Sequence, residues 1–512
     1  MRSGWVALAL LAVLALLAGC EGSGAAAFPP ASGQHSVPDT APGSAGRPNQ
    51  HSSATGNPSP APAAPHLAVD SLRQHADVAS GGKAAPYNYA PSVMKDGGSY
   101  RMWWCSQLPG IQPAGDDILY ATSHSLDGPF SAGGKSAAAA FHGSGGGFDS
   151  KHTCDPSVLR VKGTYYLYYT GSSGNREHGN SIGVATSKDG TAFSRIEGGR
   201  PIVTPAEDTR RSNGYGVGQP SAVYLNGWVY LMFTDTTGEA AGWNGAGQFV
   251  LRSTDPTFRS HVQALSVHGF HPVGSTVAVR DRSIVDAFSA DWMWVGALDA
   301  FAVAHETKTG TTITFWNADF TRNPYQPVEL RGPWQEGPGL VRSPQGHAPS
   351  AAKDPCGRVP IDVIRATRNA AAPTGLAHFG LDLHGIDGCH SRSQALAALD
   401  GYAVPSPQRT IDLVLGGGLI EIERRSVATL IARKVLDTPV PALDGATVVE
   451  RIAAGAPAVS AAGRPVALRL ADGTLWPISA ATAKANDSAV TVISTPQWDS
   501  YPLGADLAAV NG

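Results

Sequence analysis

A fifteen-residue frame occurs three times in this 512-residue chain, and it constrains the fold more than any other feature. The copies cover 90–104, 155–169 and 219–233, each with Pro second, Ser third, a turn near the middle and an apolar, aromatic-rich pair last. A shorter strand-like run follows each copy. Each frame is typical of a hairpin, and self-similarity at a fixed period indicates a repeat architecture. Four short strands in a unit of roughly 65 residues is the size of a propeller blade.

Two further units fit the frame less closely. Their anchors are Asp286 and Glu336, so the five anchors at 90, 155, 219, 286 and 336 are separated by 65, 64, 67 and 50 residues. This spacing predicts an all-β fold, a five-bladed β-propeller over residues 77–395. A β-sandwich containing two hairpin repeats is the alternative.

The pattern changes after Cys389. Strand-like runs begin at Ile411, Leu419, Val466 and Val490, with turns between them. We therefore expect residues 400–512 to form a separate small β-rich domain with one short helix. Three consecutive glycines at 416–418 are interpreted as a turn, because the Lys-Ser/Thr pair and helix of a phosphate loop do not follow.

The N-terminus has the features of an exported protein. Arg2 precedes an apolar run from Trp5 to Ala18, which is too short to span a bilayer comfortably but suits a signal peptide. The run ends in Leu-Ala-Gly before Cys20, which resembles a bacterial lipobox. We predict a signal peptide over 1–19, lipidation of Cys20 and a Pro/Ala/Gly/Ser-rich tether over 20–76, giving a membrane-anchored lipoprotein of the cell envelope. An ordinary signal peptide with a chance cysteine is the alternative.

Four cysteines remain after Cys20, and an even number in an exported protein favours disulfides. Of the three pairings, the sequence-nearest one joins Cys105 to Cys154 and Cys356 to Cys389. No C-x-x-C spacing indicates zinc. The formal net charge is -3 and Lys and Arg form no cluster, so nothing favours nucleic-acid binding. We expect a monomer.

The first strand of every propeller blade begins near the central channel, so equivalent frame positions converge. These positions are Ala90 (next to Tyr89), Asp155, Gln219, Asp286 and Glu336. Three carboxylates around one pocket suit glycoside hydrolysis. One activates water, a protonated one gives its proton to the leaving oxygen, and a third raises the pKa of that acid.

These residues resemble a known family. Asp155 in Asp-Pro-Ser-Val, Asp286 in the fourth unit and Glu336 in Glu-Gly-Pro are similar, in type and order, to the Asp, Asp, Glu set of family 43 glycoside hydrolases. The resemblance covers about residues 86–390. It implies a five-bladed propeller that cleaves β-xylosides or α-L-arabinofuranosides with inversion. Asp155 would be the general base, Asp286 the pKa modulator and Glu336 the general acid.

One departure leaves alternatives open. The family normally has Asp-Pro at the first frame, where this chain has Ala90-Pro91. Either the acidic set is shifted by one blade, or the base has been lost. Loss would leave a non-catalytic glycan-binding propeller or an enzyme of a different subfamily. A structural envelope protein is a separate alternative. Related propellers that act on fructosides, or that perform phosphorolysis of mannosides, are further alternatives.

Several other side chains are candidates for binding the carbohydrate substrate. Tyr89 and Trp334 lie at expected pocket-lining ends and suit stacking on a sugar. His152 lies three residues before Asp155, and Gln219 shares its frame position. His347 would bind substrate or hold a central ion, such as calcium. No organic cofactor is expected.

Overall fold

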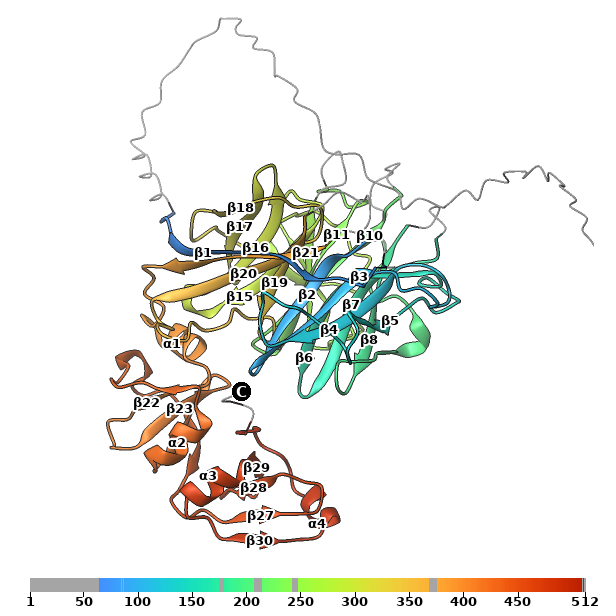
Figure 1. Cartoon of the computed structure of the whole chain (residues 1–512). Helices are drawn as coiled ribbons and strands as arrows, with labels where there is room; N and C mark the ends of the chain where they lie inside the picture. Colours follow the sequence, from blue (N-terminus) through green and yellow to red (C-terminus); the bar gives the residue numbers. More distant parts are fainter. Residues whose placement is uncertain are drawn as a thin grey trace, which may run out of the picture. The chain divides into compact units, whose positions relative to one another are not determined.

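The computed structural model describes residues 64–83, 85, 87–174, 179–206, 214–241, 247–367, 375–508 and 510. The predicted signal peptide, Cys20 and most of the predicted tether lie outside the described residues. The described part is mostly β-structure, arranged in several sheets (Figure 1). None of the helices in these residues is long and apolar enough to cross a membrane.

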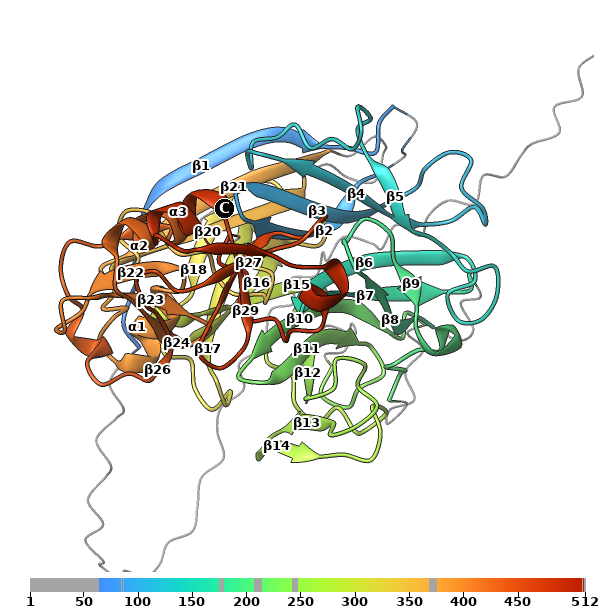
Figure 2. The same cartoon turned by 90° about the horizontal axis from the view of Figure 1, so that it is seen from below.

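Four successive groups of antiparallel strands follow one another along the chain, and a fifth group completes the set (Figure 2). The first is β2 (Tyr89–Asp96), β3 (Ser99–Ser106), β4 (Asp117–Ser123) and β5 (Ala138–Phe141). The second is β6 (His152–Val161), β7 (Thr164–Ser172), β8 (Ser181–Ser187) and β9 (Ser194–Arg195), followed by η2 (Glu197–Gly199). The third is β10 (Val217–Leu225), β11 (Trp228–Asp235), β12 (Gln248–Ser253), β13 (Gln263–Ser266) and β14 (Gly269–Pro272). The fourth is β15 (Ala290–Val295), η3 (Gly296–Leu298), β16 (Ala300–Thr307), β17 (Gly310–Asn317) and β18 (Val328–Arg331).

The fifth group joins the two ends of this region. It contains β19 (Gly339–Arg342), β20 (Arg358–Ala366), β21 (Leu376–His384) and β1 (Ala68–Ala79). β19 also pairs in parallel with β2, so the fifth and first groups form one eight-stranded sheet. The first strands contact one another in a cycle, β2 with β6, β6 with β10, β10 with β15, β15 with β19 and β19 with β2.

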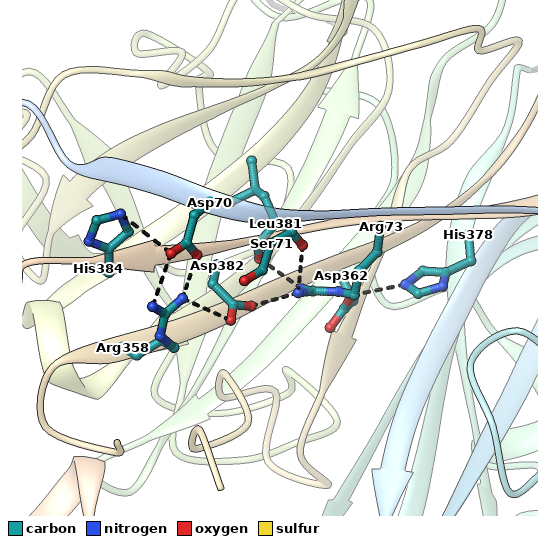
Figure 3. Close-up of polar contacts among 9 residues, drawn as sticks. All are labelled: Asp70, Ser71, Arg73, Arg358, Asp362, His378, Leu381, Asp382 and His384. Carbon is teal, nitrogen blue, oxygen red and sulfur yellow. Dashed lines mark hydrogen bonds and ion pairs between the residues drawn. The ribbon is translucent and has the colours of Figure 1, made fainter. Parts of the chain in front are cut away.

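The strand β1 begins at Ala68, inside the segment predicted to be a tether. It pairs antiparallel with β21, and an ion-pair ladder holds the two strands to β20 (Figure 3). Arg73 contacts Asp362 at 2.8 Å and Asp382 at 2.7 Å, while Arg358 bridges Asp70 and Asp382. The predicted boundary at residue 77 is therefore too late. The polar composition of this segment predicted a disordered tether, but the charged side chains of β1 form ion pairs with residues of β20 and β21.

A ladder of hydrogen bonds fixes which residues of the first strands are equivalent. In each step a backbone amide donates to a side-chain oxygen of the preceding first strand. The donors and acceptors are Val158 to Ser92 (3.0 Å), Ala222 to Ser157 (2.9 Å), Trp292 to Ser221 (3.3 Å) and Leu340 to Asp291 (2.7 Å). Asp291 therefore takes the place of the frame serine in the fourth group.

This register corrects two predicted anchors. Counting back two residues from Ser92, Ser157 and Ser221 gives Ala90, Asp155 and Gln219, as the repeat predicted, but the fourth and fifth equivalents are Ser289 and Gly337 rather than Asp286 and Glu336. Ala90, Asp155, Gln219 and Gly337 share a positive φ of 47°, 47°, 52° and 58°. In the first three groups a register shift of the hairpin occurs at this point, as in a β-bulge. Glu336 is thus one residue out of the predicted register.

The C-terminal residues form two sheets of similar design. The helix α1 (Arg392–Ala398) begins with a capping box between Ser391 and Gln394. The first sheet has the order β25-β22-β23-β24-β26 and the second the order β30-β27-β28-β29, so four strands of each recur in the same arrangement. Their strands are β22 (Tyr402–Pro405), β23 (Ile411–Leu415), β24 (Gly418–Ile422), β25 (Lys434–Val435), β26 (Val448–Ile452), β27 (Ala458–Ser460), β28 (Val466–Arg469), β29 (Leu475–Ile478) and β30 (Val490–Val492). The remaining elements are α2 (Arg425–Ile431), η4 (Pro441–Leu443), α3 (Ala480–Ala485) and α4 (Thr495–Asp499). Strands occur at all four predicted runs, but there are more helices than the single one expected. The two sheets share one apolar core.

Candidate active site

The starts of β6 and β10 and the residues just before β19 bring three predicted site residues together. The Gln219 amide Nε2 donates a hydrogen bond to Glu336 Oε1 at 3.1 Å. The backbone amide of Gln219 donates to the Thr170 hydroxyl at 2.8 Å, and that hydroxyl is hydrogen-bonded to Asp155. A polar chain therefore runs from Asp155 through Thr170 and Gln219 to Glu336.

Asp155 is buried, with only 7% of its surface exposed. Burial raises its pKa to about 7, the hydrogen bond from Thr170 opposes the rise, and the negative charge of Asp116 adds to it. A carboxyl group with this pKa changes its protonation state close to neutral pH. Such a group can accept a proton from water.

Glu336 has the higher pKa of the two. Its pKa is raised to about 8, mainly by burial and also by the charges of Asp155 and Asp116, while the Gln219 hydrogen bond opposes the rise. Since a carboxyl group is protonated below its pKa, Glu336 carries its proton at neutral pH. It can therefore donate a proton to a leaving oxygen.

Asp116 is the third carboxylate of this cluster, and the repeat pattern did not predict it. It immediately precedes β4, the strand that was recognised only as the run following the first frame. Its carboxylate accepts a hydrogen bond from the Tyr87 hydroxyl and lies 3.0 Å from His152 Nδ1. Two consecutive acidic residues, Asp116 and Asp117, before an apolar strand were the signal that could have identified it.

Asp117 follows Asp116 in the chain and is almost completely buried. One carboxylate oxygen accepts the Leu108 amide at 3.0 Å, and the other has no hydrogen-bond partner within the described ranges. Burial raises the pKa of Asp117 to about 6, and the charge of Asp116 contributes. Two adjacent acidic residues, Asp116 and Asp117, therefore lie where β4 begins.

A disulfide forms one wall of the site. Cys105 and Cys154 are bonded, and so are Cys356 and Cys389, so both predicted pairings are confirmed. The Tyr89 hydroxyl lies 3.2 Å from the Cys154 sulfur, and Cys154 directly precedes Asp155. Burial and the charges of Asp116, Glu336 and Asp155 all raise the pKa of Tyr89, which places its ring beside the three carboxylates.

The remaining predicted site residues are not all in this cluster. Trp334 is 37% exposed, two residues before Glu336, and its indole donates to the Thr307 carbonyl at 2.6 Å. Asp286 is exposed on the segment before β15, three residues before the register position at Ser289. His347 contacts the Tyr224 carbonyl at 2.7 Å, at the opposite end of β10 from Gln219.

Arg342 occupies the point where the first strands meet, a role that no sequence pattern predicted. Its buried guanidinium is ion-paired with Asp291 at 3.1 Å. It donates to Ser221 Oγ (3.1 Å), the carbonyls of Trp292 (2.9 Å) and Ala222 (3.2 Å), Ser92 Oγ (3.4 Å) and Ser157 Oγ (3.5 Å). The guanidinium already holds these oxygens and would repel a cation at this point. A central ion at His347 stays a prediction.

A separate cavity of about 350 Å³ lies at the other end of β2. Lys95, Tyr100, Asp362 and Asp382 are among its lining residues. It shares none of the carboxylates at the start of β6, so the two sites are distinct.

Comparison with known families gives one match. Residues 67–257 match the model of glycosyl hydrolases family 43. This range contains Asp116, Asp155 and Gln219, whereas Glu336 lies beyond it. The family resemblance predicted from the sequence is thereby confirmed, as is the prediction of a glycosidase. No curated protein matches the chain.

Solved structures give more distant similarities. A family 117 glycoside hydrolase of the marine bacterium Zobellia galactanivorans aligns with 14% identity and a TM-score of 0.42, over 61% of this chain and 91% of that one. An α-L-arabinofuranosidase from Podospora anserina, solved with cellotriose, has 11% identity and a TM-score of 0.38, over 60% and 96%. The catalytic domain of a family 62 α-L-arabinofuranosidase from Coprinopsis cinerea has 11% identity and a TM-score of 0.37, over 61% and 97%. Scores of this size carry no argument about function.

Proposed function

Since residues 67–257 match family 43 glycosyl hydrolases, we propose that the protein hydrolyses O-glycosidic bonds of a xyloside-like or arabinofuranoside-like carbohydrate. In this proposal the five strand groups form a five-bladed propeller, with the active site where β6, β10 and β19 begin. The contact cycle of the first strands supports that arrangement.

Glu336 is the general acid and Asp155 the general base. The observation that carries this assignment is the hydrogen-bonded chain between them, combined with their different pKa values of about 8 and about 7. Between these values Glu336 keeps its proton while Asp155 is mostly ionised. The base takes a proton from water as the water oxygen attacks the anomeric carbon, and the acid gives its proton to the leaving oxygen as the glycosidic C–O bond breaks. Attack from the face opposite the leaving oxygen inverts the anomeric centre.

Asp116 takes the modulating role that the sequence assigned to Asp286. Its charge raises the pKa of both other carboxyl groups, which supports a position close to each. Tyr89 beside the carboxylates and Trp334 near the acid provide aromatic surfaces for a sugar ring. His152 contacts Asp116 and would lie close to the same sugar ring.

The test is turnover of a panel of aryl furanosides and pyranosides by purified protein, with the product anomer followed by NMR from the first seconds. Appearance of the inverted anomer supports the proposal. A retained anomer would contradict the inverting mechanism. If the wild type turned over none of the substrates, and so did not differ in turnover from the Glu336→Gln control, the enzyme assignment would be contradicted.

A glycan-binding ring without catalysis is the second candidate, and Ala90 is the observation that favours it. At this first ring position the family usually has aspartate, and here no carboxylate is available. This candidate predicts that Asp155→Asn retains the affinity for oligosaccharides and that the wild type never releases a product from them.

We further propose that Cys20 is lipidated and that the protein acts outside the cytoplasm on the envelope side. The two disulfides fit an exported protein, because such bonds persist in oxidising compartments.

A further inference from the structure

One nitrogen of His152 makes two contacts with Asp116. His152 Nδ1 lies 3.1 Å from the backbone nitrogen of Asp116, whose N–H points at it. The same Nδ1 lies 3.0 Å from Asp116 Oδ2. The two contacts make opposite demands on Nδ1, which must be without a hydrogen for one and carry a hydrogen for the other.

An amide N–H can only donate, so the backbone contact is attractive only when Nδ1 has a free lone pair. A carboxylate oxygen can only accept, so the side-chain contact is attractive only when Nδ1 carries a hydrogen. A neutral His152 with its hydrogen on Nε2 therefore satisfies the backbone contact. A protonated His152 satisfies the carboxylate contact and neutralises the Asp116 charge.

We propose that His152 and Asp116 form a proton-dependent pair that sets the negative charge facing Asp155 and Glu336. His152 is then a positioning residue that acts through Asp116. The inference rests on the proposed function, because it treats Asp155 and Glu336 as the catalytic base and acid.

Other charged or titratable groups surround this pair. The Tyr87 hydroxyl donates to the second Asp116 oxygen, and Asp117 follows in the chain. The Lys151 ammonium and His152 Nε2 both approach Gly174. His142 is exposed, and its charge, like that of His152, lowers the pKa of Asp117. Only His152 contacts the Asp116 carboxylate directly among these histidines.

The pair affects the two limbs of a pH–rate profile differently. At alkaline pH a neutral His152 leaves the Asp116 charge uncompensated, which helps Glu336 to keep its proton. At acidic pH a protonated His152 compensates that charge, which helps Asp155 to stay ionised. The expected result is an active pH range wider than the same carboxylates would have alone.

Nitrogen NMR of the histidine-labelled full chain tests the pair without any substrate. The neutral form of His152 should have its hydrogen on Nε2, and Nδ1 should carry a hydrogen only in the charged form. A neutral form with its hydrogen on Nδ1 would overturn the inference whether or not the protein is a hydrolase.

Kinetics on a cleaved aryl glycoside supply the second test. His152→Asn keeps an acceptor for the Asp116 amide but cannot be protonated, so the acidic limb should move up by roughly one pH unit and the alkaline limb should stay. Asp116→Asn should move both limbs down, and the control His142→Asn should move neither. Equal movement of both limbs in His152→Asn would contradict the pair. If the NMR result holds but no substrate is cleaved, the proposed function fails and the pair stands.

Discussion

The side-chain amide of Gln219 donates a hydrogen bond to the Glu336 carboxylate across 3.1 Å, joining the third strand group to the fifth. This bond stabilises the ionised form of Glu336 and so lowers its pKa, against the larger effect of burial. The protonation of the proposed acid thus depends on a residue that is 117 positions away in the chain.

The first prediction concerns this bond. Gln219→Leu removes the donor, so the pKa of Glu336 should rise further and the alkaline limb of the pH–rate profile should move up by roughly half a unit to one unit. The acidic limb should change less. The measurement is kcat/KM against pH for wild type and variant. A downward shift of the alkaline limb would show that the bond does not act on an ionising Glu336.

The second prediction concerns the whole profile. Asp155 must lose its proton near pH 7 and Glu336 must keep its proton up to about pH 8, so kcat/KM should follow a narrow bell between these values. Asp155→Asn should reduce turnover by roughly 10²-fold or more on every substrate. Glu336→Gln should slow poor leaving groups far more than activated aryl groups, which need little protonation. Equal slowing of both would exclude Glu336 as the acid.

The third prediction concerns the disulfide beside the site. Replacing Cys105 and Cys154 together with Ala should lower the free energy of unfolding by about 2–5 kcal/mol. Activity should also fall, because the bond fixes Cys154, the residue directly before Asp155, to Cys105 on β3. The matched control is the double Ala variant of Cys356 and Cys389, which should lose stability but keep its activity at temperatures where it is folded. Full activity of the first variant under the same conditions would show that the bond does not position Asp155.

The fourth prediction concerns His378, whose two ring nitrogens lie 2.8 Å from Asp127 and 2.9 Å from Asp362. Burial by itself lowers the pKa of His378, but the hydrogen bonds to Asp362 and Asp127 outweigh it and the pKa is raised. The stabilisation is therefore fully present below the pKa of an unfolded histidine and is lost as the pH rises through the folded value.

Chemical denaturation at several pH values checks this expectation. The wild type should lose on the order of 1 kcal/mol of stability relative to His378→Gln as the pH rises from 5 to 9. His75→Gln, an exposed histidine opposite His378 on β1, is the control and should follow the wild type. A constant difference between wild type and His378→Gln would contradict the prediction.

The fifth prediction concerns the proposed anchor. Cys20→Ala should release the protein from the membrane fraction of the producing cell, because lipidation requires the thiol. Fractionation followed by immunoblotting measures the distribution. A variant that stays in the membrane fraction to the same degree would contradict the lipobox interpretation.

The sequence by itself determined the features that depend on local repetition. The repeated Pro-Ser frames identified Ala90, Asp155 and Gln219 as equivalent, because each frame encodes the same hairpin and the same bulge with positive φ. Cysteine number and proximity predicted both disulfides correctly. The sequence contains such local patterns because the hydrogen bonds of each hairpin join residues that are close together in the chain.

Only the tertiary structure decided what the loops bring together. The fourth and fifth groups are preceded by segments of different length, so counting residues pointed to Asp286 when the ring register falls at Ser289. Asp116 joins Asp155 and Glu336 because the entries to β4, β6 and β19 meet in space. Arg342 fills the centre because the serines of three frames and Asp291 leave a set of oxygens that one guanidinium can satisfy. These contacts link residues far apart in the chain, and no local pattern encodes them.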